Sequence, residues 1–152
     1  MTFYFAYGAN MERAAMRTRC PGAVALGAAT LAGFRYVIAR GYGIVAPQAG
    51  GRVHGVLWCL TPRDYAALNL FESLDSGLYR RAFLTVEGPR GPCRALIYRA
   101  RRGGRRRAMP GYQERVVAAA ADWRLPERYI AELRRHVPGY RGTRPVETGE
   151  LA

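Results

Sequence analysis

Apolar and polar residues alternate along much of the first two-thirds of the chain, and the last third has the spacing of helices. Thr2–Tyr7 is rich in aromatic residues and Val53–Leu60 is the clearest apolar run, and both are typical of strands. "TPRDYAALNLFE" then changes to helical spacing. The pattern further predicts strands over Ala25–Leu31, Phe34–Ala39, Tyr42–Pro47, Leu78–Val86 and Cys93–Tyr98, turns at Ala32–Gly33 and Pro47–Gly51, and helices over Pro110–Trp123 and Pro126–Val137.

Two polar residues mark expected helix starts. Asn10 can cap a helix over Met11–Arg17, with Glu12 in its first turn. Thr61 is a good cap for the helix that follows it, and Asp64 completes a capping box with it. Asp64 therefore has a structural task, and we do not count it as a catalytic candidate.

Strands followed by helices favour an α+β fold with a mainly antiparallel, curled sheet over a doubly wound parallel one. The chain of 152 residues is long enough to bury a core, so we expect one domain over residues 1–152 with an extended tail from about 141 to 152. No apolar run approaches the roughly 18 residues of a membrane span. The N-terminus lacks the pattern of a signal peptide, so we expect a cytoplasmic protein.

Residues that could bind a metal are few and scattered. Cys20, Cys59 and Cys93 are predicted to be reduced packing residues, and no cysteine or histidine spacing matches a metal site. His54 lies in the middle of a predicted strand, and we assign it a structural role. We predict no metal and no cofactor.

The formal net charge of +13 comes from arginine alone, because none of the 24 basic residues is lysine. A whole chain without lysine suggests a coding bias, so the simplest interpretation is a solvated surface. The densest cluster, Arg99–Arg107, contains two glycines and is predicted to be an exposed loop. It could attract RNA or an acidic partner. It lacks the interleaved aromatic residues of single-strand binders, so the sequence gives little support for nucleic-acid binding.

The first strand ends in "YGAN", where Gly8 precedes a predicted helix. Glycine can adopt a positive φ and lets another group approach the backbone closely. The N–H groups of Gly8, Ala9 and Asn10 lie where a helix start leaves N–H groups unpaired and favours negative charge. The stretch is either a small cradle for a carboxylate or an oxyanion, or a plain tight turn, and spacing alone favours the turn.

Glu72 is the second unusual residue, because it lies at the end of an apolar helix shortly before Asp75. A negative charge at a helix C-terminus is unfavourable, which suggests that Glu72 has a task in function. The alternatives are an exposed residue at the end of the helix, or an ion pair with Arg80 or Arg81.

The motifs along the chain, taken in order, resemble the γ-glutamylcyclotransferase-like family, which includes AIG-type proteins and γ-glutamylamine cyclotransferases. "YGAN" is similar to the family's Tyr-Gly-Ser/Thr-Asn loop. "GRVHGVLWCLT", "FES" and "SGLYRR" resemble its central block, in which a glutamate precedes a Gly-x-Tyr by a few residues. "PGY", "LPERYIAEL" and "GYRG" resemble its helical end. The resemblance covers nearly the whole chain.

The resemblance implies a small closed or nearly closed β-barrel flanked by helices. It implies that the α-amine of a γ-glutamyl group attacks its own side-chain carbonyl, releasing 5-oxoproline and a free amine or amino acid. Ala9 departs from the family, which commonly has a hydroxyl residue there, so only its N–H can contact substrate. Glu72 matches the catalytic glutamate, and the substrate-binding positions match Tyr7, Gly8, Ala9, Asn10, Tyr79 and Tyr112.

This chemistry agrees with the residues. A carboxylate whose pKa is raised by apolar neighbours can take a proton from the attacking amine and give it to the departing one. Two alternatives stay open: an inactive relative that binds a small carboxylate or a protein, and a binder of RNA or an acidic partner through Arg99–Arg107. The sequence also leaves open the amine half of the substrate, turnover of glutathione, and a homodimer.

Overall fold

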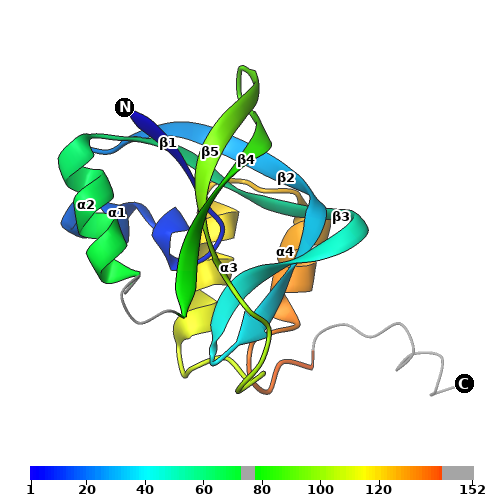
Figure 1. Cartoon of the computed structure of the whole chain (residues 1–152). Helices are drawn as coiled ribbons and strands as arrows, with labels where there is room; N and C mark the ends of the chain where they lie inside the picture. The colour runs from blue at the N-terminus through cyan, green and yellow to red at the C-terminus, as the bar shows by residue number, and fades with distance from the viewer. Residues whose placement is uncertain (73–77, 142–152) are drawn as a thin grey trace, which may run out of the picture.

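The computed structural model describes residues 1–72 and 78–141, and five strands form a closed barrel in the order β1–β3–β2–β4–β5 (Figure 1). Neighbouring strands are antiparallel, except that β1 and β5 close the barrel in parallel where Tyr4 pairs with Leu96. The strands are β1 (Thr2–Ala6), β2 (Val24–Ala39), β3 (Tyr42–Leu60), β4 (Tyr79–Gly88) and β5 (Gly91–Ala100). The predicted α+β fold with a mostly antiparallel, barrel-like sheet is confirmed.

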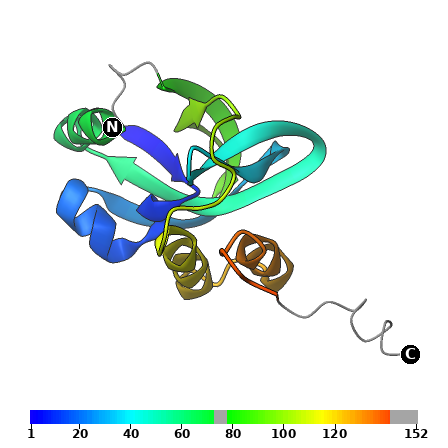
Figure 2. The same cartoon turned by 90° about the horizontal axis from the view of Figure 1, so that it is seen from below.

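Helices cover the outside of the barrel in two pairs, with α1 and α2 on one side and α3 and α4 on another (Figures 1 and 2). Apolar side chains of the strands, such as Phe5 and Leu96, join Val116 and Ile130 of the second pair of helices in one core. No helix in the described part of the chain is long and apolar enough to cross a membrane. The helical elements are η1 (Ala9–Met11), α1 (Arg13–Arg19), α2 (Pro62–Phe71), α3 (Tyr112–Asp122) and α4 (Glu127–Arg134).

The hairpin of β2 and β3 is longer than the sequence predicts. The predicted break after Ala32 and the predicted turn after Pro47 are wrong, because each strand continues through them. Ala32 pairs with Arg52 and Phe34 pairs with Pro47, so the intervening residues form a bulge. Gly33 has a φ of 84°, which suits a glycine at such an irregularity. Pairing resumes on both sides, so the glycines and the proline bend the hairpin without ending it.

The first helix also differs from the prediction. Its cap is Glu12 rather than Asn10, and the single turn of η1 separates it from β1. Asn10 is buried, where its side-chain amide donates to the Tyr4 hydroxyl (3.1 Å) and accepts from Arg19, so it does not cap a helix. Gly8 does not use the positive φ that glycine allows, because its φ is −124°.

Helix α2 begins as the sequence predicts. The backbone N–H of Asp64 donates to the Thr61 hydroxyl, and the backbone N–H of Thr61 donates to the Asp64 carboxylate, each over 3.1 Å. This capping box confirms the structural task of Asp64. The helix ends at Phe71, which places Glu72 directly after it, at the entry to the candidate site.

Candidate active site

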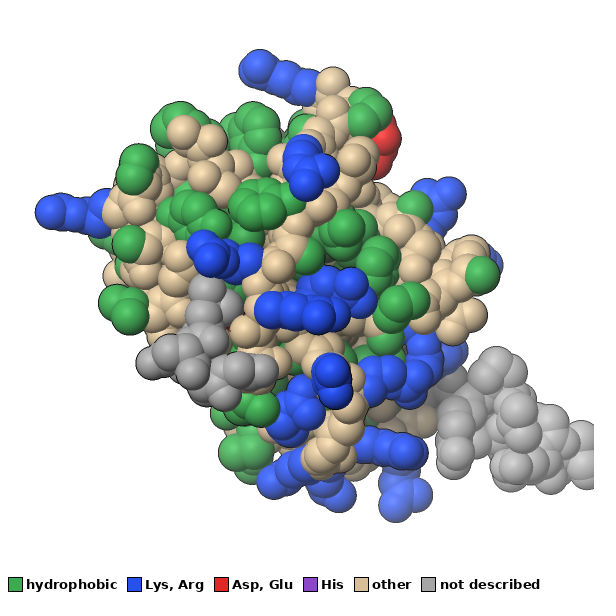
Figure 3. Space-filling model, viewed as in Figure 1, with side chains coloured by type: hydrophobic (Ala, Val, Ile, Leu, Met, Phe, Trp, Pro, Cys, Tyr) green, Lys and Arg blue, Asp and Glu red, His purple; other side chains and the backbone are tan. Residues whose placement is uncertain are grey.

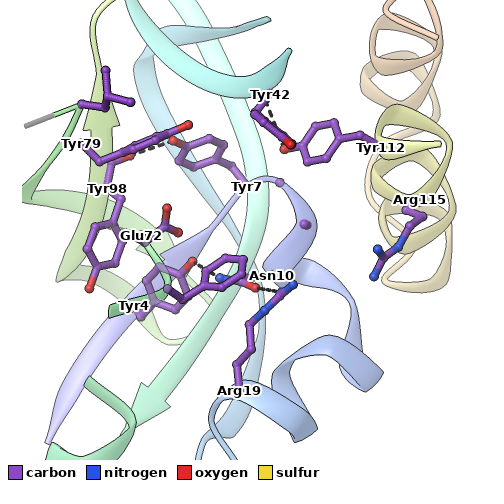
Figure 4. A pocket seen from close by; sticks show the side chains of 15 residues that line it. Tyr4, Tyr7, Asn10, Arg19, Tyr42, Glu72, Tyr79, Tyr98, Tyr112 and Arg115 are labelled. Atoms are coloured by element: carbon purple, nitrogen blue, oxygen red, sulfur yellow. Dashed lines mark hydrogen bonds between the residues drawn. The ribbon is translucent and has the colours of Figure 1, made fainter. Parts of the chain in front are cut away.

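A cavity of about 460 Å³ opens at one end of the barrel. It lies where β1 and β5 finish and β3 and β4 start, next to the beginning of α3 (Figure 4). Every residue that the sequence analysis proposed for the site lines this cavity. The lining residues are Tyr4, Tyr7, Gly8, Ala9, Asn10, Arg19, Tyr42, Gly43, Phe71, Glu72, Leu78, Tyr79, Tyr98, Tyr112 and Arg115.

The loop after β1 is held against the cavity by tyrosines from distant parts of the chain. The Tyr7 hydroxyl donates to the backbone carbonyl of Tyr98 over 2.7 Å, which fixes the start of the loop. A Cβ at Gly8 would lie 2.7 Å from the Tyr112 hydroxyl oxygen. Glycine is therefore required at this position by the close approach of a tyrosine and not by its backbone angle.

Tyr112 is held at the loop by backbone N–H groups. The N–H of Gly43 donates to the Tyr112 hydroxyl over 3.2 Å. Burial raises the pKa of Tyr112, and the backbone N–H groups of Gly43 and Ala9 oppose that rise. The N–H of Ala9 thus faces this part of the cavity. Its side chain is a methyl group and offers no polar atom to a ligand.

Glu72 projects its carboxylate into the space bounded by the rings of Tyr4, Tyr7 and Tyr79 (Figure 4). Burial raises the pKa of Glu72 to about 7, and the nearby charge of Arg19 limits the rise. The alternative prediction of an ion pair with Arg80 or Arg81 is wrong, because neither arginine forms an ion pair with Glu72 among the described residues. Arg81 instead donates to the Tyr65 hydroxyl. Asp75 lies outside the described residues.

The tyrosines of the cavity share the electrostatic environment of Glu72. Burial, and next the charge of Glu72, raise the pKa of both Tyr4 and Tyr7. The same two causes, in the same order, raise the pKa of Tyr79 and Tyr98. These hydroxyls therefore stay protonated at neutral pH, and two of them already donate within the protein, Tyr7 to the Tyr98 carbonyl and Tyr98 to the side chain of Asn69.

Sequence reasoning missed several lining residues, above all Tyr4, Tyr98 and Arg19. Tyr4 is buried on the face of β1 opposite to Phe5, where its ring lies edge-on to that of Tyr98. Tyr98 lies near the end of β5, which the parallel closure of the barrel brings beside the first loop. Successive residues are buried around each of them, Tyr4–Ala6 in β1 and Ala95–Tyr98 in β5, so alternation along the strands does not single out these two tyrosines. Nothing in the sequence separates Arg19 from the other arginines.

The arginine cluster lies outside the cavity lining. Arg99 belongs to β5, and residues 101–107 are exposed, which confirms the predicted loop for that part. On the face in Figure 3, arginine side chains gather toward the end where this loop lies in Figure 1. The loop is tied to the tip of the β2–β3 hairpin, because Arg40 N–H donates to the carbonyl of Gly103 and Gly41 N–H to that of Arg105.

His54 also lies away from the cavity lining, in β3. Its Nδ1 is 3.1 Å from the Thr30 hydroxyl, and its ring packs edge-on against Tyr129 with 4.8 Å between centroids. These contacts support the structural role that the sequence predicts. Cys20 is buried in the core, as a packing residue should be.

Comparison with known families adds to this geometry. The family described as "Gamma-glutamyl cyclotransferase, AIG2-like" matches residues 4–125, which include the cavity-lining residues. The chain belongs to this family. No curated protein matches the sequence.

Several solved structures have a similar fold. One, titled "Gamma-glutamyl cyclotransferase", has a TM-score of 0.83 and 21% identity, covering 99% of this chain and 96% of its own. YkqA from Bacillus subtilis has a TM-score of 0.77 and 24% identity, covering 91% of this chain and 54% of its own. An AIG2-like protein from Mus musculus has a TM-score of 0.56 and 22% identity, covering 74% and 82%. At these identities the likeness concerns the fold.

Proposed function

We propose that this protein is a γ-glutamyl cyclotransferase that converts a γ-glutamyl amine or γ-glutamyl amino acid into 5-oxoproline and the free amine or amino acid. The observation that carries the proposal is a half-buried carboxylate, Glu72, with a pKa raised by burial to about 7, in the same cavity as the Tyr7–Asn10 loop. Membership of the γ-glutamyl cyclotransferase family supports the reaction type.

Glu72 serves both proton transfers. Its carboxylate takes a proton from the substrate's α-amine as the nitrogen attacks the γ-carbonyl carbon and the ring C–N bond forms. The acid then gives that proton to the departing nitrogen as the original amide C–N bond breaks. A pKa near 7 suits a group that must accept and donate a proton at neutral pH. The reaction exchanges one C–N bond for another without oxidation, so we propose no cofactor.

The loop after β1 stabilises the charge that develops on the carbonyl oxygen. Its N–H groups, from Gly8 to Asn10, come at the end of a strand and the start of a helical turn, where N–H groups lack partners within the helix. Donors fixed in this way stabilise an oxyanion without reorganising during the reaction. Ala9 takes part only through its N–H, which in the free protein faces the Tyr112 hydroxyl.

The rings around the cavity hold the γ-glutamyl chain in a bent form. Tyr7, Tyr79 and Tyr112 come from three separate segments and line the same cavity as Glu72. Because the amine is then held near the γ-carbonyl before the reaction, much of the entropy of ring closure is lost on binding and no longer adds to the activation barrier.

The direct test is release of 5-oxoproline from a panel of γ-glutamyl-alanine, a γ-glutamylamine and glutathione. We expect turnover of the first two, because the motifs look more like the small branch of the family than its glutathione-specific branch. Efficient turnover of glutathione would overturn this substrate preference. Failure to release 5-oxoproline from any γ-glutamyl compound would favour an inactive relative that binds a small carboxylate.

A further inference from the structure

Arg19 differs from the other charged residues of the cavity. Arg115 is largely exposed and forms an ion pair with Glu12 over 2.6 Å, so its charge is already balanced. Arg19 is half-buried, lines the cavity, and makes no ion pair within residues 1–72 and 78–141. Arg19 is therefore a guanidinium of the cavity that forms no direct ion pair in the described part of the chain, although its charge acts on the carboxylates of Glu72 and Glu12.

Two neutral groups hold Arg19 in place. Its guanidinium lies over the ring of Phe71, 3.8 Å from the centroid. It also donates to the side-chain carbonyl of Asn10. The amide nitrogen of Asn10 donates in turn to the Tyr4 hydroxyl over 3.1 Å, which fixes the carbonyl toward Arg19. A guanidinium held in this way keeps further N–H donors for a ligand and loses little freedom on binding.

Arg19 and Glu72 are close enough for the arginine charge to act on the carboxylate, yet they do not form an ion pair. A γ-glutamyl group carries an amine and a carboxylate on the same carbon atom. If its amine lies at Glu72, as the proposed function requires, its carboxylate is attached to that same carbon and lies within the same cavity as the Arg19 guanidinium.

We propose that Arg19, held by Asn10 and Phe71, forms a carboxylate-binding subsite for the substrate. This inference rests on the proposed function and deepens it. The α-carboxylate of the γ-glutamyl group is favoured because it shares a carbon atom with the amine that lies at Glu72, and a carboxylate on the leaving amino acid is the other source of the same chemistry. With the carboxylate bound at Arg19, the N–H groups of the Gly8–Asn10 loop are left for the carbonyl oxygen.

Binding of the product tests the subsite separately from turnover. 5-Oxoproline carries the α-carboxylate and no leaving group, and 2-pyrrolidinone is the same ring without the carboxylate. We expect calorimetry to show that Arg19→Gln weakens binding of 5-oxoproline roughly 10-fold to 100-fold, the usual size for a charge-assisted hydrogen bond. Arg19→Lys should weaken it less, and binding of 2-pyrrolidinone should not change. Arg17→Gln is the matched control, because Arg17 is exposed on the same helix.

Kinetics then identify the carboxylate. If Arg19→Gln raises KM equally for γ-glutamyl-methylamide and γ-glutamyl-alanine, the subsite binds the α-carboxylate. If KM rises only for γ-glutamyl-alanine, it binds the carboxylate of the leaving group. Two results for Arg19→Gln would overturn the subsite. One is that neither the binding of 5-oxoproline nor KM changes. The other is that kcat falls at constant KM and the pH profile shifts, which would mean that Arg19 acts through Glu72. Absence of turnover in the wild-type protein would instead refute the proposed function, and the binding experiment would still decide on Arg19.

Discussion

Replacing Glu72 with glutamine is the sharpest test of the proposed chemistry. Glutamine keeps the size of the side chain and most of its hydrogen bonding, but it cannot carry a proton. General acid–base catalysis typically raises a rate about 100-fold to 10,000-fold. One group serves both proton transfers here, so we expect the fall in kcat to lie near the upper end. Ligand binding should persist, because the loop N–H groups and the tyrosines are unchanged.

The same substitution should change the stability of the protein in a pH-dependent way. Burial raises the pKa of Glu72 from 4.5 to about 7. The unfolded chain therefore ionises first, and wild-type stability falls as pH rises from about 4.5 to 7 and remains lower above that. The loss amounts to roughly 3 kcal/mol for a shift of this size. Glu72→Gln escapes this loss, so its melting temperature should exceed that of the wild type by up to roughly 10 °C at pH 8 and by much less at pH 5.

The assay combines 5-oxoproline release with thermal melting between pH 5 and 9. Wild-type kcat/KM should rise with pH through about 7, the pKa to which burial raises Glu72. Glu87→Gln is the matched control, because Glu87 is exposed on β4 and does not line the cavity. Asp75→Asn should keep normal turnover. If Glu72→Gln is active and Asp75→Asn is not, the wrong carboxylate has been named. A melting difference that does not vary with pH would refute the argument from burial.

Three further experiments test the loop after β1, the arginine loop and the cap of α2. Gly8→Ala should lower the melting temperature, because its Cβ would lie 2.7 Å from the Tyr112 hydroxyl oxygen, and Tyr112→Phe in the same protein should restore it; no recovery would mean that the contact is unimportant. Replacing the three arginines at 105–107 with serine should leave turnover unchanged, because they are exposed and outside the cavity lining, and a collapse in rate with the fold intact would show that this loop reaches the substrate. Thr61→Ala should cost about 1 kcal/mol of stability in denaturant unfolding by removing the cap of α2, and an unchanged midpoint would contradict that role.

Local chemistry in the sequence determined the parts of the structure that depend on near neighbours. The capping box of Thr61 and Asp64 joins residues three positions apart, and it forms as the sequence predicts. The barrel strands likewise follow from apolar alternation, because period-two spacing puts one face of a strand toward the core. The motifs at Tyr7–Asn10 and Glu72 could also be found from the sequence, since each stands at the end of a recognisable strand or helix.

Contacts between distant segments decided what the sequence could not. Asn10 looked like a helix cap, but it is buried and bound to Tyr4 and Arg19. Gly8 looked like a residue chosen for its backbone angle, but what requires it is a tyrosine hydroxyl from the start of α3. In both cases the deciding partner is brought close only when the barrel closes and the helices pack on it.

The same reason explains the chemistry of the site. The sequence could place Glu72 at the end of a helix, but the pKa of its carboxylate depends on how completely the surrounding rings exclude water, which is a property of the closed barrel. Among the 24 arginines, only packing could single out Arg19 as a cavity residue, because its surroundings come from the first loop and the end of α2. Sequence pattern therefore singled out Glu72 and the Tyr7–Asn10 loop as candidates, and the tertiary structure determined the raised pKa of Glu72 and placed Arg19 in the same cavity.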